Sequence, residues 1–402
     1  MRRRAFWTLL ELALAAPASA QYRRGLSDRG LDSLRQATLI DSVDAESYYR
    51  YGLGLWEKHK FDAADSAFRR ALHFAPWHAG AHLALGALPY GRGGRYLFDL
   101  PRRLPADSFR AFIKGTGRHT RDALLMDPLV DLTPLRFLDD EELVPDGGRM
   151  LCIGGMCFLM GRSRWFRPMR TGARYLVSGH ADSAYQVLSA AMATRDTNET
   201  LPDDFVLYLT LAADRSGHPE LAMDGYQELA RRAGRREANS FIMSPVSGDR
   251  VLYLVLYGMS ADRVGHPAVA RAAFREALTV DLALYQAHSR LADLAEMNGN
   301  TEEAVTERRA AIDLAPDVGR LHLDLGITFL QAGRSAEAEA ELQQAAASLP
   351  WDPGVQLFLF QSALANSDRP TAERAFAALA LFAPRRNADQ VADARRMLAA
   401  LP

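Results

Sequence analysis

Six histidines occupy two recurring positions in the chain, and imidazole is a common ligand of transition metals. One set follows a glycine and comprises His180, His218 and His266; the other comprises His82, His288 and His322. Members of a set lie at equivalent places in successive blocks of sequence, which are about 10 Å apart in a stacked structure. A metal ion needs its ligands at about 2 Å, so no two members of one set can share an ion. We therefore predict no metal site, with loop positions for the first set and packing positions for the second.

The two cysteines, Cys152 and Cys157, flank the four residues Ile-Gly-Gly-Met. In an oxidising compartment, thiols at the two ends of such a turn could close a disulfide across a small hairpin. The alternative is a pair of buried free thiols. Two sulfurs with no nearby histidine or further cysteine offer too few ligands for a metal ion.

Local patterns of known catalytic chemistry are missing from the sequence. It has no G-x-S-x-G nucleophile turn, no H-E-x-x-H zinc motif, no G-x-x-x-x-G-K-[ST] phosphate loop, and no G-x-G-x-x-G between a strand and a helix. We predict no catalytic residue and no cofactor, and we expect a protein that is not an enzyme. Because a catalytic triad can assemble from distant residues, an enzyme with its site in residues 87–164 is the alternative.

Arginines gather in two basic runs that could contact an anionic surface. The first run comprises Arg92, Arg95, Arg102, Arg103, Arg110, Lys114, Arg118 and Arg121, and the second Arg162, Arg164, Arg167, Arg170 and Arg174. An acidic run at residues 139–142 lies between them, and pairing within the molecule or exposure to solvent is the expected state of these charges. The formal net charge of the chain is -1, so we expect no nucleic-acid partner.

The N-terminus has the order of a secretory signal peptide. Arginines at positions 2–4 precede a mostly apolar stretch at residues 5–16, and Ala-Ser-Ala at 18–20 forms a cleavage site. Glu11 departs from this pattern, and a short amphipathic helix is the alternative. No later stretch reaches the roughly 18 apolar residues needed to cross a bilayer. We expect an exported protein, periplasmic or secreted, with no transmembrane segment after cleavage.

The elements that position these residues follow from a repeating period. Pro316, Pro350 and Pro384 are spaced by 34 residues, and each proline can be set at position 32 of a block. Small residues then recur at positions 8, 20 and 27, and a large one at position 24. In the block from Ala45 to His78 these positions hold Gly52, Ala64, Phe68, Ala71 and Pro76.

This period and pattern resemble the tetratricopeptide-repeat (TPR) family over roughly two thirds of the chain. The resemblance implies an all-α fold: a right-handed superhelical solenoid of helix-turn-helix repeats with an irregular insertion. Stacking is required because one helix pair cannot bury its apolar face alone. Four blocks follow one another without a gap, starting at Val251, Tyr285, Gly319 and Pro353. Glycines at position 15 are expected to turn the chain between the two helices in a left-handed conformation, namely Gly265, Gly299 and Gly333.

The repeats divide the chain into seven segments. They are a signal peptide at 1–20, a lead-in helix at 21–44, N-terminal repeats at 45–86, the insertion at 87–164, degenerate repeats at 165–234, a C-terminal array at 251–386 and a capping helix at 387–402. After residue 79 a second repeat begins, but Pro89 and the glycines after it are expected to end its first helix. Its second helix is expected to start near Phe109 and to end by Pro128. Within the insertion, residues 150–160 are expected to form a hairpin.

In the TPR family, first-helix positions 5, 9 and 12 line a concave groove that binds partners. The corresponding candidate groove residues are Tyr49, Leu53, Trp56, Leu207, Leu211, Val255, Met259, Asp293, Leu323, Ile327 and Leu330. We expect them to form an exposed apolar stripe with acidic interruptions, including Asp214, Asp262 and Glu296, that binds a protein or peptide. The alternative is that the insertion or neighbouring helices fill the groove. The lysine, asparagine and arginine that grip a C-terminal carboxylate in some TPR proteins are missing at positions 5 and 9.

These observations favour a non-catalytic scaffold of the bacterial cell envelope that binds a protein or peptide in its groove. The bacterial assignment rests on composition, because arginine carries nearly all of the positive charge and alanine is abundant. The alternatives are an envelope enzyme with a site in residues 87–164 and a protein that binds anionic surfaces through its arginines.

Overall fold

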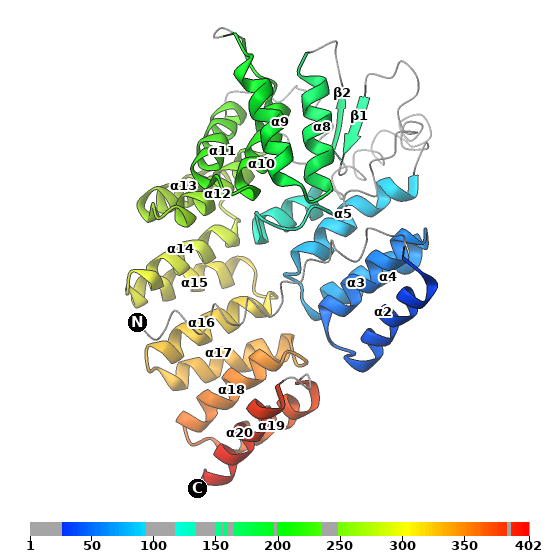
Figure 1. Cartoon of the computed structure of the whole chain (residues 1–402). Helices are drawn as coiled ribbons and strands as arrows, with labels where there is room; N and C mark the ends of the chain where they lie inside the picture. Colours follow the sequence, from blue (N-terminus) through cyan, green and yellow to red (C-terminus); the bar gives the residue numbers. More distant parts are fainter. Residues whose placement is uncertain are drawn as a thin grey trace, which may run out of the picture.

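The computed structural model describes residues 26–93, 117–133, 150–153, 156–159, 164–196, 199–234, 248–383 and 387–401. Within them, helices follow one another in antiparallel pairs along a curved array (Figure 1). The signal peptide predicted at residues 1–20 lies outside these ranges. A small hairpin is the exception to the helical pattern among the described residues.

The predicted blocks of the repeat each contain one helix pair. The N-terminal helices are α2 (Asp28–Ile40), α3 (Ala45–Glu57), α4 (Phe61–Phe74) and α5 (Ala79–Gly93). The central pairs are α8 (Phe166–Val177) with α9 (Ala181–Ala193) and α10 (Asp203–Arg215) with α11 (Pro219–Ala233). The C-terminal array comprises α12 (Arg250–Arg263), α13 (Pro267–Val280), α14 (Tyr285–Met297), α15 (Thr301–Leu314), α16 (Gly319–Gln331), α17 (Ser335–Ser348), α18 (Pro353–Ala365), α19 (Arg369–Phe382) and α20 (Ala388–Ala400).

Several helices begin with a short polar side chain that caps the first turn. The carboxylates of Asp44 and Asp249 accept hydrogen bonds from the backbone N–H groups of Ser47 and Leu252, which have no partner inside the helix. Asp352 caps α18 in the same way before Pro353, which needs no partner for a backbone N–H at the first helical position. The helices are therefore defined by local sequence as well as by packing.

The two helices of a repeat approach closely at position 8 of the first helix. A Cβ atom at Gly258 would lie 2.5 Å from Cε1 of Phe274, and a Cβ at Gly52 would lie equally close to Phe68. Both phenylalanines are buried at position 24 of the second helix. Glycine at position 8 thus makes room for the ring, which explains why a small residue at position 8 goes with a large one at position 24.

The segment between α5 and α8 differs from the expectation at Pro89, because α5 continues to Gly93. An internal proline removes one backbone hydrogen bond. The preceding turns of α5 are strongly anchored: Ala81, Leu83 and Ala84 are each at most 1% exposed. Residues 117–126 are helical, within the range expected for the second helix of this repeat; the start expected near Phe109 lies outside the described residues.

The hairpin consists of β1 (Met150–Ile153) and β2 (Met156–Leu159), which pair antiparallel. The register places Cys152 opposite Cys157 and Ile153 opposite Met156. The cysteine side chains lie outside the described residues, so the disulfide remains a prediction.

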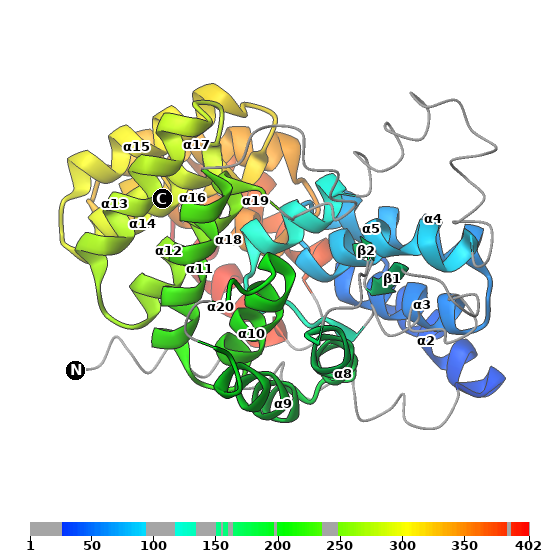
Figure 2. The same ribbon diagram turned by 90° about the horizontal axis from the view of Figure 1, so that it is seen from above.

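The first repeat packs against the C-terminal array, although the two are far apart in sequence. The indole N–H of Trp351, just before α18, donates to the carbonyl oxygen of Phe74 at 3.1 Å. The Trp351 ring also contacts the rings of His73 and Phe74, with centroid distances of 4.5 and 5.5 Å. Arg320 at the start of α16 lies over the ring of Trp77. Helices α3 to α5 therefore lie beside the array (Figures 1 and 2).

The architecture is an all-α helical repeat solenoid, which confirms the predicted fold class. A continuous hydrophobic core runs from α2 to α14, and a second core follows from α15 to α20. Among the described helices none is both long enough and apolar enough to span a membrane.

Candidate partner-binding face and a histidine cluster

Most of the predicted groove residues are buried inside the protein. Eight of the eleven are at most 8% exposed, namely Tyr49, Leu53, Trp56, Leu207, Leu211, Val255, Met259 and Leu323. The expectation that these eight form an exposed apolar stripe is therefore wrong. Leu207 and Met259 belong to the same core as Leu124 and Leu125 of the insertion, which means that the chain itself covers this part of the first-helix face.

The covering segment, residues 117–133, is held by three arginines, one from α10, one from α14 and one from the segment itself. Arg290 of α14 donates to the carbonyl oxygen of Met126 at 3.2 Å, and Arg215 at the end of α10 donates to that of Val130 at 3.2 Å. Arg121 pairs with Asp249 at 2.8 Å and lies 3.6 Å from Asp281. The segment thus crosses from α10 to α14, as in the alternative in which the insertion fills the groove.

In the first repeat, the burial comes from packing within and beside the helix pair. The ring of Tyr49 packs against Phe68 and His78, with centroid distances of 6.1 and 4.7 Å. Trp56 packs edge-on against the same Phe68 ring. These side chains are part of the core that joins α3, α4 and α5.

The remaining groove residues, Asp293, Ile327 and Leu330, keep part of their surface. The Asp293 side chain is 45% exposed, and Ile327 and Leu330 are half-buried. Leu357 and Leu364 of α18, which are not among the predicted groove residues, occupy positions 5 and 12 of their block and are also half-buried. The same register would have identified them. We refer to Ile327, Leu330, Leu357 and Leu364 as the C-terminal apolar patch.

Charged groups border this patch. The guanidinium of Arg308, from α15, lies 3.1 Å from Asp293 and 3.0 Å from Glu296 and also donates to Thr328 at 2.9 Å. Burial raises the pKa of Asp324 above its ordinary value, and the charges of Arg320 and Arg308 oppose that shift only in part. On α12, burial likewise raises the pKa of Asp262, one of the predicted acidic groove residues, above its ordinary value.

Three of the six recurring histidines precede second helices. His180, His218 and His266 are the N-cap residues of α9, α11 and α13, and none makes a side-chain capping hydrogen bond. They lie in the turns between paired helices, as predicted.

Two histidines of the other set form hydrogen bonds with glutamates within their repeats, whereas His82 does not follow that pattern. The Nδ1 atoms of His288 and His322 each lie 2.7 Å from a glutamate of the next helix, Glu307 and Glu341. His82 of α5 instead contacts His119, with 3.0 Å between their Nδ1 atoms.

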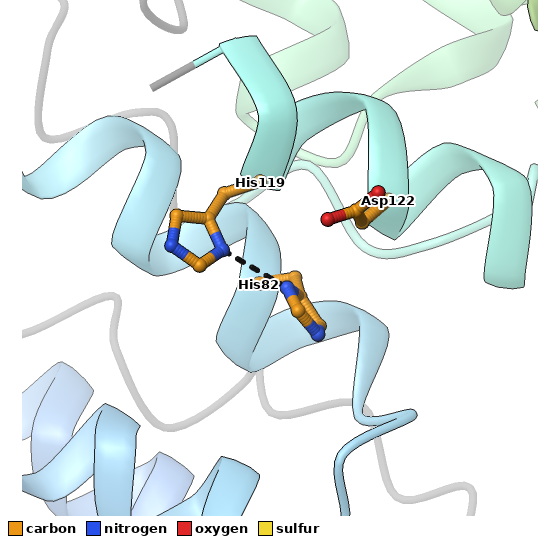
Figure 3. A group of neighbouring side chains, drawn as sticks. All are labelled: His82, His119 and Asp122. Atoms are coloured by element: carbon orange, nitrogen blue, oxygen red, sulfur yellow. Dashed lines mark hydrogen bonds between the residues drawn. The ribbon is translucent and has the colours of Figure 1, made fainter. Parts of the chain in front are cut away.

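His82, His119 and Asp122 form a cluster that the sequence reasoning missed (Figure 3). One ligand atom from each residue lies within 4.8 Å of the others. The Nε2 atom of His82 is 2.9 Å from the carbonyl oxygen of Pro76. Burial and then the neighbouring His82 lower the pKa of His119 to about 4, and burial also lowers the pKa of His82. These three residue types are the ones that hold zinc and related ions.

Among the described arginines of the two basic runs, Arg121 and Arg164 form ion pairs within the molecule. Arg121 pairs as described above, and Arg164 pairs with Glu199 while stacking over Trp165. The acidic run at residues 139–142 and much of the first basic run lie outside the described residues.

Comparison with known protein families identifies the repeat. A tetratricopeptide-repeat family model matches residues 258–318 and 298–353, which run from within α12 to the first residue of α18. Residues 258–353 therefore form tetratricopeptide repeats. TPR arrays bind protein partners, and the TPR fold is typically a non-catalytic scaffold, so these repeats indicate a protein–protein interaction scaffold.

Solved structures similar to part of this chain include several of MamA. MamA from Desulfovibrio magneticus RS-1, from residue 41 to its end, is 17% identical, with 45% of this chain and 94% of that chain covered and a TM-score of 0.37. A MamA described as the RS-1 ArsTM double mutant is 18% identical, with coverages of 46% and 97% and a TM-score of 0.38. Another MamA crystal structure is 15% identical over 44% of this chain and 93% of that chain, with a TM-score of 0.35. A comparison with curated proteins finds no significant match.

Proposed function

We propose that this TPR protein is a non-catalytic scaffold of the bacterial cell envelope that binds a protein or peptide segment on the concave face of its C-terminal array. The observation that carries the proposal is the difference in burial along the predicted groove. Eight groove residues are covered by the chain itself, whereas Ile327 and Leu330 retain exposed surface beside the 45% exposed side chain of Asp293.

The C-terminal apolar patch would provide the binding energy. Its members lie on the first helices α16 and α18, so a bound segment could contact both repeats at once. Burying half-exposed leucine and isoleucine side chains releases water and favours association. Asp293 and Glu296 at the border would select a partner with basic or neutral groups at the matching positions and set its orientation.

We propose export because residues 1–20 have the order of a signal peptide. We propose that the protein is non-catalytic because of its TPR fold and because its sequence lacks known catalytic motifs. The alternatives are an enzyme with a site in residues 87–164 and an anion-binding surface formed by the arginines. Arg121 and Arg164 form ion pairs within the molecule, which disfavours a role for these two arginines in an anion-binding surface.

The test is capture of partners from an envelope extract by the full chain, at low and high salt, with two double variants. Ile327→Glu/Leu330→Glu places charge on the patch, while Leu314→Glu/Met297→Glu places the same charge on side chains that are 41% and 73% exposed. Leu323 is avoided because it is buried and a glutamate there would unfold the repeat.

We expect a protein that wild type and control variant retain at both salt concentrations and that the patch variant loses. Circular dichroism of all three proteins ensures that the loss is not unfolding. Equal capture by the patch variant would exclude the patch as the binding face. Capture that only salt removes would instead favour the arginine surface, because phosphate-type binding weakens steeply with ionic strength.

A further inference from the structure

We propose that His82, His119 and Asp122 bind a zinc ion between α5 and the helical residues 117–126. The proposal is independent of partner binding on the array. It rests on the convergence of two imidazoles and a carboxylate from two helices, with their ligand atoms within 4.8 Å of one another.

The hydrogen bond of His82 to the backbone determines which ring nitrogen is available. A carbonyl oxygen can only accept, so the Nε2 atom of His82, 2.9 Å from the oxygen of Pro76, carries the proton. In the neutral ring the Nδ1 atom then holds a free lone pair, and this atom faces Nδ1 of His119 at 3.0 Å. Metal-binding histidines usually have such an outer hydrogen bond, which fixes the orientation and tautomer of the ring.

The three ligand atoms need only small movements to reach a metal-binding geometry. Ligand atoms of a tetrahedral zinc site are about 3.3 Å apart when each lies about 2 Å from the ion. The two Nδ1 atoms are 3.0 Å apart, and the widest separation in the cluster is within 4.8 Å. Asp122 follows His119 by three residues on the same helix, so both side chains lie on one face and a side-chain rotation could bring its carboxylate closer.

The protonation states also suit a cation. Burial lowers the pKa values of both histidines below the ordinary value, which leaves the rings uncharged and able to coordinate at neutral pH. Burial raises the pKa of Asp122, and within the described residues this carboxylate makes no hydrogen bond or ion pair. A bound dication would compensate for its loss of hydration.

Neighbouring positive charges oppose binding, but two of the three are already paired. Arg69 and Arg118 lie close enough to lower the pKa of His119. Arg69 forms an ion pair with Asp65, and Arg121 with Asp249, whereas Arg118 is exposed to solvent. Asp65 also acts on His119 with the opposite sign. The net field at the cluster is therefore weaker than three arginines alone would give.

Three protein ligands leave at least one coordination position for water, as in zinc sites with an open position. The ion would join α5 to residues 117–126 and so fix the end of the segment that covers the array. Without an ion, the same contact is a hydrogen bond from Nδ1–H of His119 to Nδ1 of His82. A zinc site and a hydrogen-bonded histidine pair can be distinguished by measuring metal binding.

The test uses the full chain after treatment with a chelator and dialysis. Zinc binding is measured by calorimetry, and cobalt is used as a second probe because tetrahedral cobalt absorbs visible light. We expect wild type to bind one zinc ion, and His119→Ala and Asp122→Asn to bind at least about 10-fold more weakly. Zinc should also raise the melting temperature of wild type but not of the two variants.

Two control variants separate this site from other possible ligands. His322→Ala removes a histidine of the same repeat position that pairs with Glu341, and Cys152→Ser/Cys157→Ser removes both thiols. Both controls should bind zinc as wild type does. No zinc binding by wild type, or binding that survives His119→Ala and Asp122→Asn, would overturn the proposal and leave the two histidines as a hydrogen-bonded packing pair. Melting curves recorded in the presence of chelator show whether each variant is folded.

Discussion

At the scale of single residues, the turn inside each repeat requires a left-handed backbone conformation at position 15, which favours glycine. Position 15 holds glycine in several blocks, and Gly265, Gly299 and Gly333 have φ values of 81°, 72° and 73°. The blocks that start at residues 45 and 353 have His59 and Ser367 there, with φ values of 57° and 58°. A side chain disfavours this left-handed conformation by about 1–2 kcal/mol, so these two turns are strained.

We expect Ser367→Gly to stabilise the protein by about 0.5–1 kcal/mol, because relief of the strain exceeds the greater flexibility of glycine in the unfolded chain. Ser367 is exposed, so few contacts change. The reverse substitution, Gly299→Ser, should be destabilising by a similar amount, since a Cβ atom there would meet nothing within 4 Å and only the conformation is affected. Chemical denaturation measures both. An unchanged Ser367→Gly variant would mean that the turn carries no strain.

Residue patterns predicted the left-handed glycines and the recurrence of a small residue at position 8 and a large one at position 24, because both depend on neighbours within one repeat. They did not predict the histidine cluster. His119 and Asp122 belong to no recognisable repeat position, and their approach to His82 depends on how a distant segment packs. Equivalent positions of successive repeats lie too far apart to share a metal ion, but this cluster joins non-equivalent positions.

At the scale of elements, each helix pair follows the 34-residue spacing, whereas the exposure of a helix face depends on what packs on it. Leu207 and Val255 occupy groove positions by register, yet the first is 3% exposed and the second is fully buried. The sequence of α10 and α12 carries no signal that residues 117–133 cover this face. Arg121, Arg215 and Arg290 make that connection through contacts far apart in the chain.

Asp324 of α16, whose side chain is 20% exposed, should make the stability of the protein depend on pH. Its pKa is raised in the folded state, mainly by burial. The unfolded protein therefore gives up this proton at lower pH than the folded protein does. The stabilising contribution of the group is present below the unfolded pKa and is lost as the pH rises through the folded value.

Accordingly, Asp324→Asn should become more stable relative to wild type as the pH rises from 4 to 7, because asparagine does not ionise. Urea denaturation at several pH values measures this difference. Asp313→Asn, on the exposed side of α15, is the control and should show a smaller dependence. A constant difference between Asp324→Asn and wild type would contradict the raised pKa.

At the scale of the whole molecule, the contact of Trp351 with the end of α4 determines how the first repeat lies against the array. It combines one hydrogen bond to Phe74 with ring contacts to His73 and Phe74. Residue 351 is 277 positions from residue 74, so no local rule of helix pairing predicts it. TPR sequence patterns specify neighbours along a solenoid, but they do not specify contacts between its distant parts.

We expect Trp351→Ala to destabilise the protein by about 2 kcal/mol and to increase its radius of gyration in small-angle X-ray scattering, because the N-terminal helices lose this contact. Trp351→Phe keeps an aromatic ring and loses only the hydrogen bond, at a cost of about 1 kcal/mol, and should remain compact. If Trp351→Ala has the same dimensions as wild type, other contacts, such as that of Arg320 with Trp77, suffice to hold the first repeat.

The same contact bears on how the chain folds. An open solenoid can form or lose one repeat at a time, since each repeat touches only its neighbours. When helices from opposite halves of the chain must meet, the loop-closure entropy delays the final step, and folding slows as the mean sequence separation of contacts grows. The packing of Trp351 on Phe74 thus converts part of a sequential process into a cooperative one, in which loss of the terminal repeats at one end weakens those near the other.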